Sequence, residues 1–181
     1  MRPIAITMSA LMLSAVAGRA VAGYADDRAE IENLSNRYMI AVDAGDIDTV
    51  MSTWAEDGVL DWVGGVEHGR EAIRKAMSGF GGLLRGNIPE NATTRQRTRH
   101  QIINHVIDVD GNKATTVAYW FAITNNTPQQ DVQLLYFGHY EDELVRHNGH
   151  WLFSKRKIYN ESRPNKALVY PRLGEKDPRA K

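Results

Sequence analysis

The apolar residues near the N-terminus recur three or four positions apart, which is the spacing of one helix face. In the range 27–44 this face consists of Ile31, Leu34, Tyr38 and Ala41. Gly45 predicts the end of this helix, because glycine readily adopts the left-handed conformation found at helix ends. Asp46 then predicts the N-cap of a short second helix. Its apolar side contains Ile47, Val50, Met51 and Trp54.

The next stretch contains one short strand signal and one helix signal. Val59–Val63 predicts a strand, and two glycines separate it from a third helix at about Gly69–Phe80. Residues 81–97 contain Gly, Asn and Thr without periodicity. This pattern predicts a loop of the length that often covers a site.

From residue 98 onward the pattern is that of strands joined by tight turns. Asp110-Gly111 and Asn148-Gly149 are strong hairpin signals. The strands predicted around them are Thr98–Val109, Ala114–Ile123, Val132–Val145 and Trp151–Tyr159. Helices followed by hairpin-linked strands predict an α+β domain, with three N-terminal helices packed on one face of a strongly bent, mainly antiparallel sheet.

Alternation along a strand assigns side chains to the two faces of the sheet. On the first long strand it groups His100 with Ile102, Asn104 and Val106, and it groups Gln101 with Ile103, His105 and Ile107. On the strand from Val132, the face of Gly138 also carries Leu134, Tyr136, Tyr140 and Leu144.

Composition narrows the class of protein. The chain has 181 residues, of which 43% are hydrophobic and 24% are charged, and this suits one globular domain with a proper core. Lys+Arg and Asp+Glu both number 22, so the charge gives no reason to expect nucleic acid or a membrane surface as a partner. There is no cysteine, so thiol chemistry and disulfides are excluded.

Residues 1–22 have the pattern of a secretory signal peptide. Arg2 precedes an apolar run from Ile4 to Val16, and the small residues 20–22 end the segment at the cleavage spacing. The alternatives are a misassigned start and a disordered tail. We therefore expect a secreted or periplasmic protein, or otherwise a cytoplasmic one, with the folded domain at 23–160 and a patternless tail at 161–181.

Asp43 and His100 are the first candidates for chemistry. Asp43 lies in the last turn of the first predicted helix, where a carboxylate faces the negative end of the helix dipole. Residues that break a local rule often serve function, although a solvated Asp is the simpler interpretation. A histidine beside a buried carboxylate has one tautomer fixed and can act as a base near neutral pH. A partly buried histidine can also be only a core residue.

Other kinds of site find little support. His147 and His150 straddle an exposed turn without further ligands at metal spacing, so we expect no metal. The glycines between residues 79 and 86 do not follow a strand or precede a GK[ST] sequence, which excludes a phosphate loop of that type. No Gly-x-Ser-x-Gly sequence occurs. We expect no cofactor.

Several segments resemble the SnoaL-like family of the nuclear transport factor 2-like superfamily. The range 27–46, with Tyr38 and Asp43, is similar to the first helix of the family. Thr98-Arg99-His100 is similar to the start of its histidine-bearing strand, and residues 138–151 resemble its Gly-x-Tyr-x-Asp strand and closing Gly-x-Trp turn. The resemblance spans about residues 26–160 and implies a cone-shaped fold that encloses a pocket.

The resemblance also implies an activity. Scytalone dehydratase, hexachlorocyclohexane dehydrochlorinase and bile acid 7α-dehydratase pair an aspartate on the first helix with a strand histidine, which correspond here to Asp43 and His100. A tyrosine five residues before the aspartate in the bile acid enzyme corresponds to Tyr38. These similarities predict a cofactor-independent lyase that eliminates from a small apolar cyclic or polycyclic substrate. His100 would be the base, Asp43 would orient it, and Tyr38 would hydrogen-bond a substrate oxygen.

Two other hypotheses stay open, namely an isomerase or polyketide-cyclase-type enzyme and a non-catalytic small-molecule-binding domain. Alternation and the resemblance together predict the substrate-binding residues Trp62, Asn104, Trp120 and Tyr140. Ile103, His105 and Ile107 would give the second sheet face an apolar character, which predicts a homo-oligomer, a trimer rather than a dimer.

Overall fold

The structure is a computed structural model that describes residues 23–85 and 97–163. The expected signal peptide at 1–22, the part of the expected loop at 86–96, and the tail at 164–181 lie outside these described residues. No helix in the described ranges is both long and apolar enough to cross a membrane.

The helices follow the sequence signals closely. α1 spans Tyr24–Ala44 and ends at Gly45, whose φ of 71° is the left-handed conformation that glycine favours. α2 spans Ile47–Ser52, and the Asp46 carboxylate accepts a hydrogen bond from the Thr49 backbone N–H at 3.1 Å, which caps the helix. α3 spans Gly69–Arg85, so it includes five residues that had been predicted as loop.

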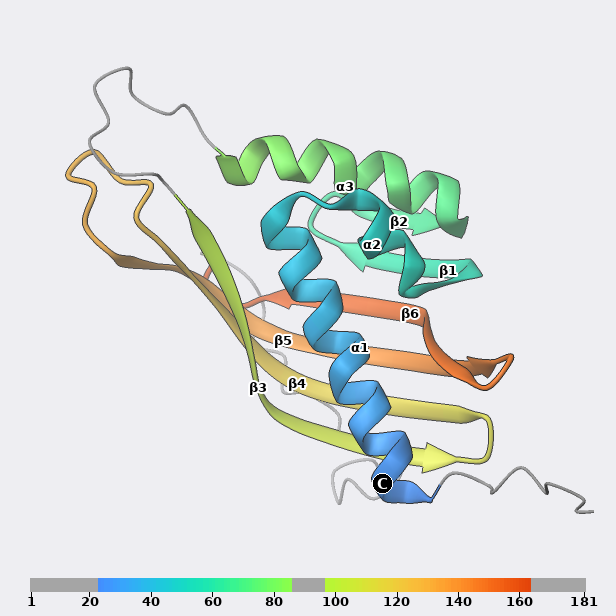
Figure 1. Ribbon diagram of the computed structural model, residues 1–181. Coiled ribbons are helices and arrows are strands. Elements are labelled where there is room, and N and C mark those ends of the chain that lie inside the picture. The colour runs from blue at the N-terminus through green and yellow to red at the C-terminus, as the bar shows by residue number, and fades with distance from the viewer. Residues whose placement is uncertain (1–22, 86–96, 164–181) are drawn as a thin grey trace, which may run out of the picture.

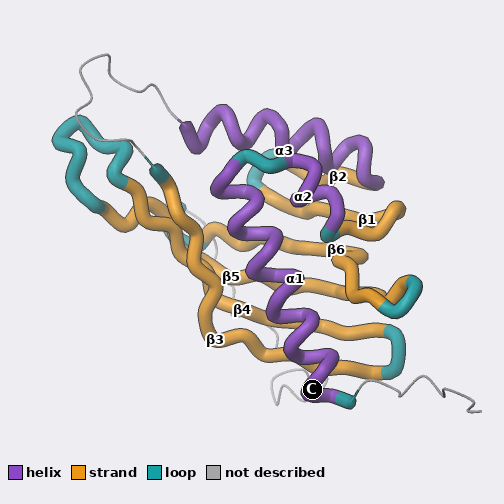
Figure 2. The backbone as a smooth tube through the Cα atoms, in the orientation of Figure 1, coloured by secondary structure: helices purple, strands orange, loops and turns teal. Residues whose placement is uncertain are grey.

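The strands form one bent sheet in the order β2-β1-β6-β5-β4-β3 (Figures 1 and 2). β1 pairs with β6 in parallel, and all the other neighbours are antiparallel. The strands are β1 Trp54–Trp62, β2 Gly65–His68, β3 Thr98–Asp110, β4 Lys113–Thr124, β5 Gln133–His147 and β6 His150–Asn160. The expected α+β class, with helices on one face of a mainly antiparallel sheet, is confirmed.

The first strand region differs from the prediction. Trp54 begins β1 instead of ending α2, and the four-residue edge strand β2 was not predicted. In β2 every residue is exposed or half-buried, so it carries no apolar alternation that the sequence could reveal.

A bulge in β3 reverses the predicted alternation. The register with β4 shifts between Ile103 and Val106, and Asn104 has a φ of 53°. A bulge places two residues opposite one, so every later side chain changes face. Val106 is therefore 43% exposed while Ile107 is buried in the core. The expectation that Ile103 and Ile107 share the outer face is wrong for this reason.

A second register shift changes the face of one residue of β5. Ala122 pairs with Tyr136 whereas Ile123 pairs with Leu134, so Leu135 is the extra residue. Leu134 is 60% exposed, and Leu135 lines the interior instead. Tyr136, Tyr140 and Leu144 keep the face predicted for them. Only Leu134 lies on the face opposite to the predicted one, because it lies beyond the bulge.

α1 crosses the concave face of the sheet, and α3 lies over β1 and β2 (Figure 1). The apolar side of α1 packs with the buried strand residues Trp54, Leu60 and Phe153. Each fully buried side chain of this size stabilises the fold by about 1.5–3 kcal/mol relative to leaving it exposed. α1 also contacts β3, and Asp43 at its C-terminal end reaches His100 near the start of that strand.

Candidate active site

A cavity of about 510 Å³ lies between the helices and the concave face of the sheet. α1 contributes Tyr38, Met39 and Val42 to its wall, and α3 contributes Met77 and Phe80. The remaining walls come from β1, from the strands β3 to β6, and from the segments that directly follow β1, β4 and β6. Most of the lining is aromatic or aliphatic, and the volume is that of a typical small-molecule site.

Asp43 and His100 meet at the wall of this cavity. The His100 ring nitrogen Nδ1 lies 2.7 Å from Asp43 Oδ1, and the His100 backbone N–H donates to Asp43 Oδ2 at 2.9 Å. Both side chains are more than nine-tenths buried. One carboxylate therefore holds both the ring and the main chain of the histidine, and the predicted contact is present.

This contact decides the protonation pattern of the ring. An ionised carboxylate only accepts hydrogen bonds, so Nδ1 carries the proton and Nε2 keeps its lone pair. His100 lines the cavity, whereas Asp43 lies behind it. In the uncharged ring this arrangement leaves Nε2 able to accept a proton, and the carboxylate stabilises the resulting cation.

Aromatic rings continue on both sides of His100. Its ring centroid lies 6.5 Å from that of Phe80 and 6.1 Å from that of Trp120. Trp120 stacks on Tyr140 at 5.7 Å, and Phe80 meets the edge of Trp62 at 5.6 Å. These rings give the cavity a continuous apolar wall that suits a cyclic hydrocarbon skeleton.

Tyr38 also lines the cavity, from the same helix as Asp43. Its hydroxyl donates to the Met77 sulfur at 3.9 Å, which is a weak hydrogen bond. Burial raises the pKa of Tyr38, and the nearby Arg156 cation partly opposes this. The phenol is therefore neutral and can donate to an oxygen of a bound molecule.

A buried ion pair beneath Tyr38 was not predicted. The Arg156 guanidinium makes two hydrogen bonds to the Asp142 carboxylate, at 2.9 and 2.7 Å, and both side chains are 1% exposed. The guanidinium carbon lies 4.4 Å from the ring centroids of both Tyr38 and Tyr140. Burial lowers the pKa of Arg156, but the charge of Asp142 and its hydrogen bonds outweigh this and raise it.

The sequence contained no clear signal for this pair, because strict alternation from Phe153 places Arg156 on the other face and only the register shift between β5 and β6 places it inward. Arg156 occupies an inward position on β6 between the apolar residues Phe153 and Ile158, where a charge is costly unless it is paired. Its partner could not be identified without the register between β5 and β6.

Three of the four predicted binding residues line the cavity, namely Trp62, Trp120 and Tyr140. Asn104 does not, because the β3 bulge places it outside the regular alternation in an exposed, left-handed conformation. Asn104 is among the residues that tolerate this conformation best after glycine. Asn104 lies in the bulge and is not in the cavity lining, where alternation had placed it.

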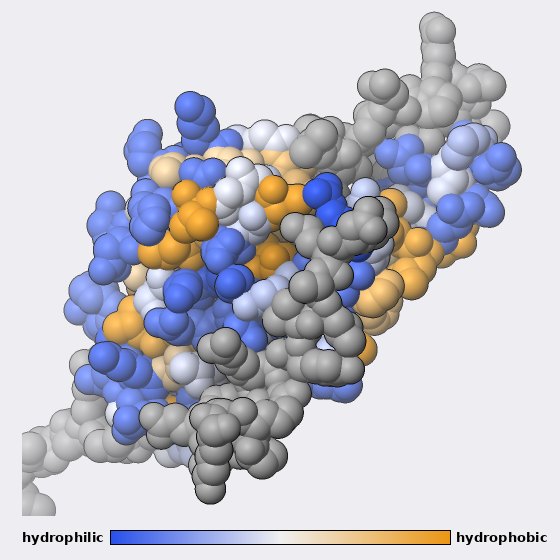
Figure 3. Space-filling view, turned by 180° about the vertical axis from the view of Figure 1, so that it is seen from behind, coloured by the Kyte–Doolittle hydropathy of each residue, from blue (hydrophilic) through white to orange (hydrophobic). Residues whose placement is uncertain are grey.

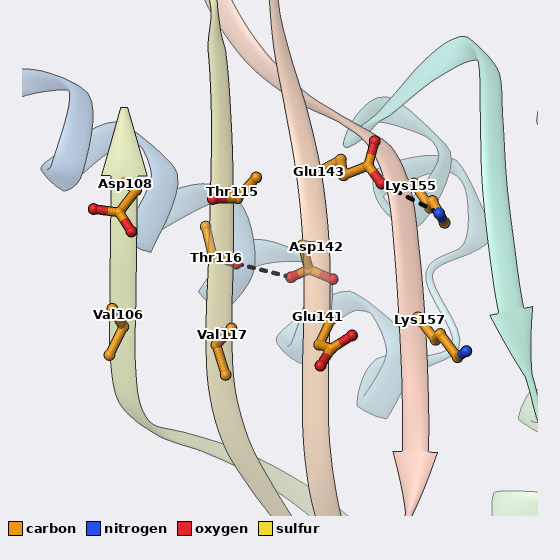
Figure 4. Close-up of a pocket in the computed structure, with 10 residues that line it drawn as sticks. All are labelled: Val106, Asp108, Thr115, Thr116, Val117, Glu141, Asp142, Glu143, Lys155 and Lys157. Carbon is orange, nitrogen blue, oxygen red and sulfur yellow. Dashed lines mark hydrogen bonds and ion pairs between the residues drawn. The ribbon is translucent and has the colours of Figure 1, made fainter. Parts of the chain in front are cut away.

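A smaller groove of about 200 Å³ lies on the opposite face of the sheet (Figure 4). Its lining carries four acidic side chains, Asp108, Glu141, Asp142 and Glu143, and two lysines, Lys155 and Lys157. The Lys155 ammonium lies 3.2 Å from the Glu143 carboxylate, and Thr116 donates to Asp142 at 3.2 Å. The groove is remote from Asp43 and His100, so we assign the chemistry to the larger cavity. In the described part of the chain, no group of three or more His, Asp or Glu side chains is placed to hold a metal.

The fold and the aspartate–histidine cavity define a small α+β pocket protein of the cystatin-like type. A family model described as the SnoaL-like domain matches residues 23–157. The chain therefore belongs to the SnoaL-like family, and the resemblance seen in the sequence is confirmed. The family includes dehydratases and polyketide cyclases.

Solved structures of similar shape agree with this assignment. A Mycobacterium tuberculosis protein of unknown function is 23% identical, with 85% of this chain and 88% of that chain covered at a TM-score of 0.65. A scytalone dehydratase-like protein of Novosphingobium aromaticivorans is 23% identical over 74% and 83% of the two chains, with a TM-score of 0.60. ActVI-ORFA of Streptomyces coelicolor is 19% identical over 74% and 96%, also with a TM-score of 0.60. At these identities the likeness establishes the fold alone. No curated protein matches the sequence.

Proposed function

We propose that this protein is a cofactor-independent lyase that eliminates water, or a comparable leaving group, from a small apolar cyclic or polycyclic substrate. The observation that supports this most is the contact between Asp43 and His100 at the cavity wall. A neutral imidazole backed by a carboxylate, inside an apolar cavity, is suited to removing a proton from carbon next to a carbonyl.

In the proposed reaction, His100 Nε2 takes a proton from the carbon between the substrate carbonyl and the carbon that bears the hydroxyl. The electron pair of that C–H bond forms the new double bond, and the C–O bond to the leaving hydroxide breaks. The hydroxide takes up the proton held by His100, so the products are the unsaturated ketone and water. The imidazolium exists only between these two proton transfers, and Asp43 stabilises it there.

Tyr38 supplies the second group in this proposal. Its neutral hydroxyl can donate to the substrate carbonyl oxygen, where negative charge builds up as the proton leaves. The buried Arg156 cation behind the ring makes that hydroxyl a better donor. The two groups act at opposite ends of the same developing enolate, so both contribute to one transition state.

Isomerisation and cyclisation can begin with the same proton transfer, so the products distinguish the reactions. A panel of cyclic β-hydroxy ketones and halogenated rings, followed by mass spectrometry, is the first experiment. We expect loss of water or of hydrogen halide. A product with unchanged mass would show isomerisation or cyclisation instead, and a ligand that binds without being converted would support a pocket-only function.

Tyr38→Phe tests the proposed division of roles on the substrate that this panel identifies. The change removes one hydrogen bond and keeps the aromatic packing, so we expect kcat to fall by about tenfold. Proton abstraction is a role in the transition state, so we expect His100→Gln to abolish turnover and to leave the Kd of a bound product nearly unchanged. A larger loss of turnover from Tyr38→Phe than from His100→Gln would reverse the two roles.

A further inference from the structure

The polar groups of the cavity are distributed unevenly along it. His100 lies on β3, whereas two other polar residues of the same lining, Asn160 and Arg163, lie at the end of β6 and in the turn that follows it. Asn160 pairs with Gly138, and Gly138 pairs with Trp120, so Asn160 and His100 are on strands three places apart in the sheet. Three strand spacings separate them by roughly 14 Å along the sheet.

Arg163 lies at the opening of the cavity. The exposed members of the lining include Val63, Gly64, Tyr136 and Arg163, whereas Tyr38, Trp120 and Tyr140 at the inner end are buried. The described lining residues include no Asp or Glu, so the charge that they present at the opening is positive.

The turn that carries Arg163 directs its acidic neighbour to the other face. The Glu161 carboxylate contacts the ring of His139, which stacks on Tyr159 on the face of the sheet opposite to the cavity. The Asn160 side-chain oxygen accepts hydrogen bonds from the backbone N–H and the hydroxyl of Ser162. These bonds leave the NH₂ side of the Asn160 amide as the donor that the cavity lining can offer.

We propose that the ligand of this cavity is an apolar ring system with an anionic group, such as a carboxylate, sulfonate or phosphate, at the end remote from His100. Arg163 binds that group, with the amide of Asn160, three residues earlier in the same lining, as a second donor. A guanidinium suits such an anion because its fork of N–H donors matches a pair of oxygens. The proposal rests on the cavity being the substrate site, as in the proposed function, but it does not require His100 to be the base.

Two fluorescent probes with one skeleton test this inference. Anilinonaphthalene sulfonate and phenylnaphthylamine share their rings and differ by the sulfonate. We expect the wild-type protein to bind the sulfonate more tightly, and each probe to displace the other. Arg163→Gln should weaken binding of the sulfonate by about tenfold and should leave the neutral probe unchanged. Arg163 is exposed, so added salt should reduce this difference.

Arg37→Gln is the matched control, because Arg37 is exposed on α1 and does not line the cavity. Arg37→Gln should change the affinity for neither probe. Arg163→Lys should retain part of the preference for the sulfonate probe. The inference is wrong if the wild-type protein shows no preference for the sulfonate, if Arg163→Gln leaves that preference intact, or if neither probe binds. If binding of the sulfonate does not depend on Arg163 but turnover still depends on His100, this inference fails and the proposed function stands.

Discussion

At the scale of single residues, Asp43 connects the end of a helix to a histidine on a strand. Its position could be predicted as unusual from the sequence, because a carboxylate in the last turn opposes the helix dipole. The hydrogen bonds to His100 offset that cost. The pairing itself required the family resemblance, since the two residues are 57 positions apart.

Asp43→Asn should lower the proton-transfer rate by about 10²–10⁴-fold. The amide can donate to Nδ1, which favours the tautomer with its proton on Nε2, and that nitrogen then cannot accept a proton from the substrate. The measurement is kcat, or the rate of carbon–hydrogen exchange in a substrate analogue.

Asp46→Asn is the control for this change. Asp46 is three residues further along and caps α2 at an exposed position. Asparagine caps helices about as well as aspartate, so both the rate and the stability should hardly change. An Asp43→Asn protein that matches the Asp46→Asn protein in rate would rule out a role for the carboxylate.

The residues that the sequence misassigned have a common cause. Asn104 and Leu134 were placed by strict alternation, and each lies at or beyond a bulge that a single sequence does not reveal. Trp62, Trp120 and Tyr140 were placed correctly because no irregularity separates them from the positions used to infer their face.

At the scale of elements, β5 and β6 approach so closely at Gly138 that no side chain fits. A Cβ atom on Gly138 would overlap the backbone oxygen of Tyr159. Gly138→Ala should therefore lower the free energy of unfolding by at least about 2 kcal/mol, because backbone cannot move aside as a flexible side chain can. Urea-induced unfolding gives this value directly.

Gly79→Ala is the matched substitution in α3. A Cβ atom on Gly79 would meet nothing within 4 Å, and the position is helical. Alanine loses less backbone entropy than glycine in a helix, so the free energy of unfolding should rise by about 0.5–1 kcal/mol. Equal effects of the two substitutions would contradict the close approach of β5 and β6.

At the scale of the whole molecule, the face of the sheet opposite to α1 carries exposed apolar side chains. Ile103, Tyr119 and Phe137 are 44%, 43% and 46% exposed. From behind, apolar groups gather toward the loop between β4 and β5 (Figure 3). The sequence predicted an apolar outer face, but the bulge in β3 changes which residues form it.

We expect this face to join copies of the chain into a homo-oligomer, with a trimer favoured over a dimer. Phe137→Lys should shift the mass measured by light scattering at micromolar concentration toward that of a monomer. Ile40→Lys should not, because Ile40 is 71% exposed on α1, away from this face. A wild-type protein that is monomeric under these conditions would contradict the expectation.

The fold as a whole was predictable for a physical reason. Helical periodicity, glycine at a helix end and two hairpin turns are local signals, and each of them agrees with the final arrangement. The order of the strands in the sheet, by contrast, has no local signal in the sequence. The parallel pairing of β1 with β6, like the ion pair of Asp142 with Arg156, depends on contacts between distant segments.

Proton exchange at carbon tests most directly whether His100 is a base facing the cavity. A bicyclic ketone without a leaving group can lose and regain its acidic C–H proton, so its exchange with deuterium in D₂O reports proton abstraction alone. We expect the wild-type protein to accelerate the exchange. His100→Gln should reduce the exchange to the rate without protein, whereas His147→Gln, at an exposed histidine, should leave it unchanged. Exchange by the His100→Gln protein at the wild-type rate would show that His100 does not abstract the proton.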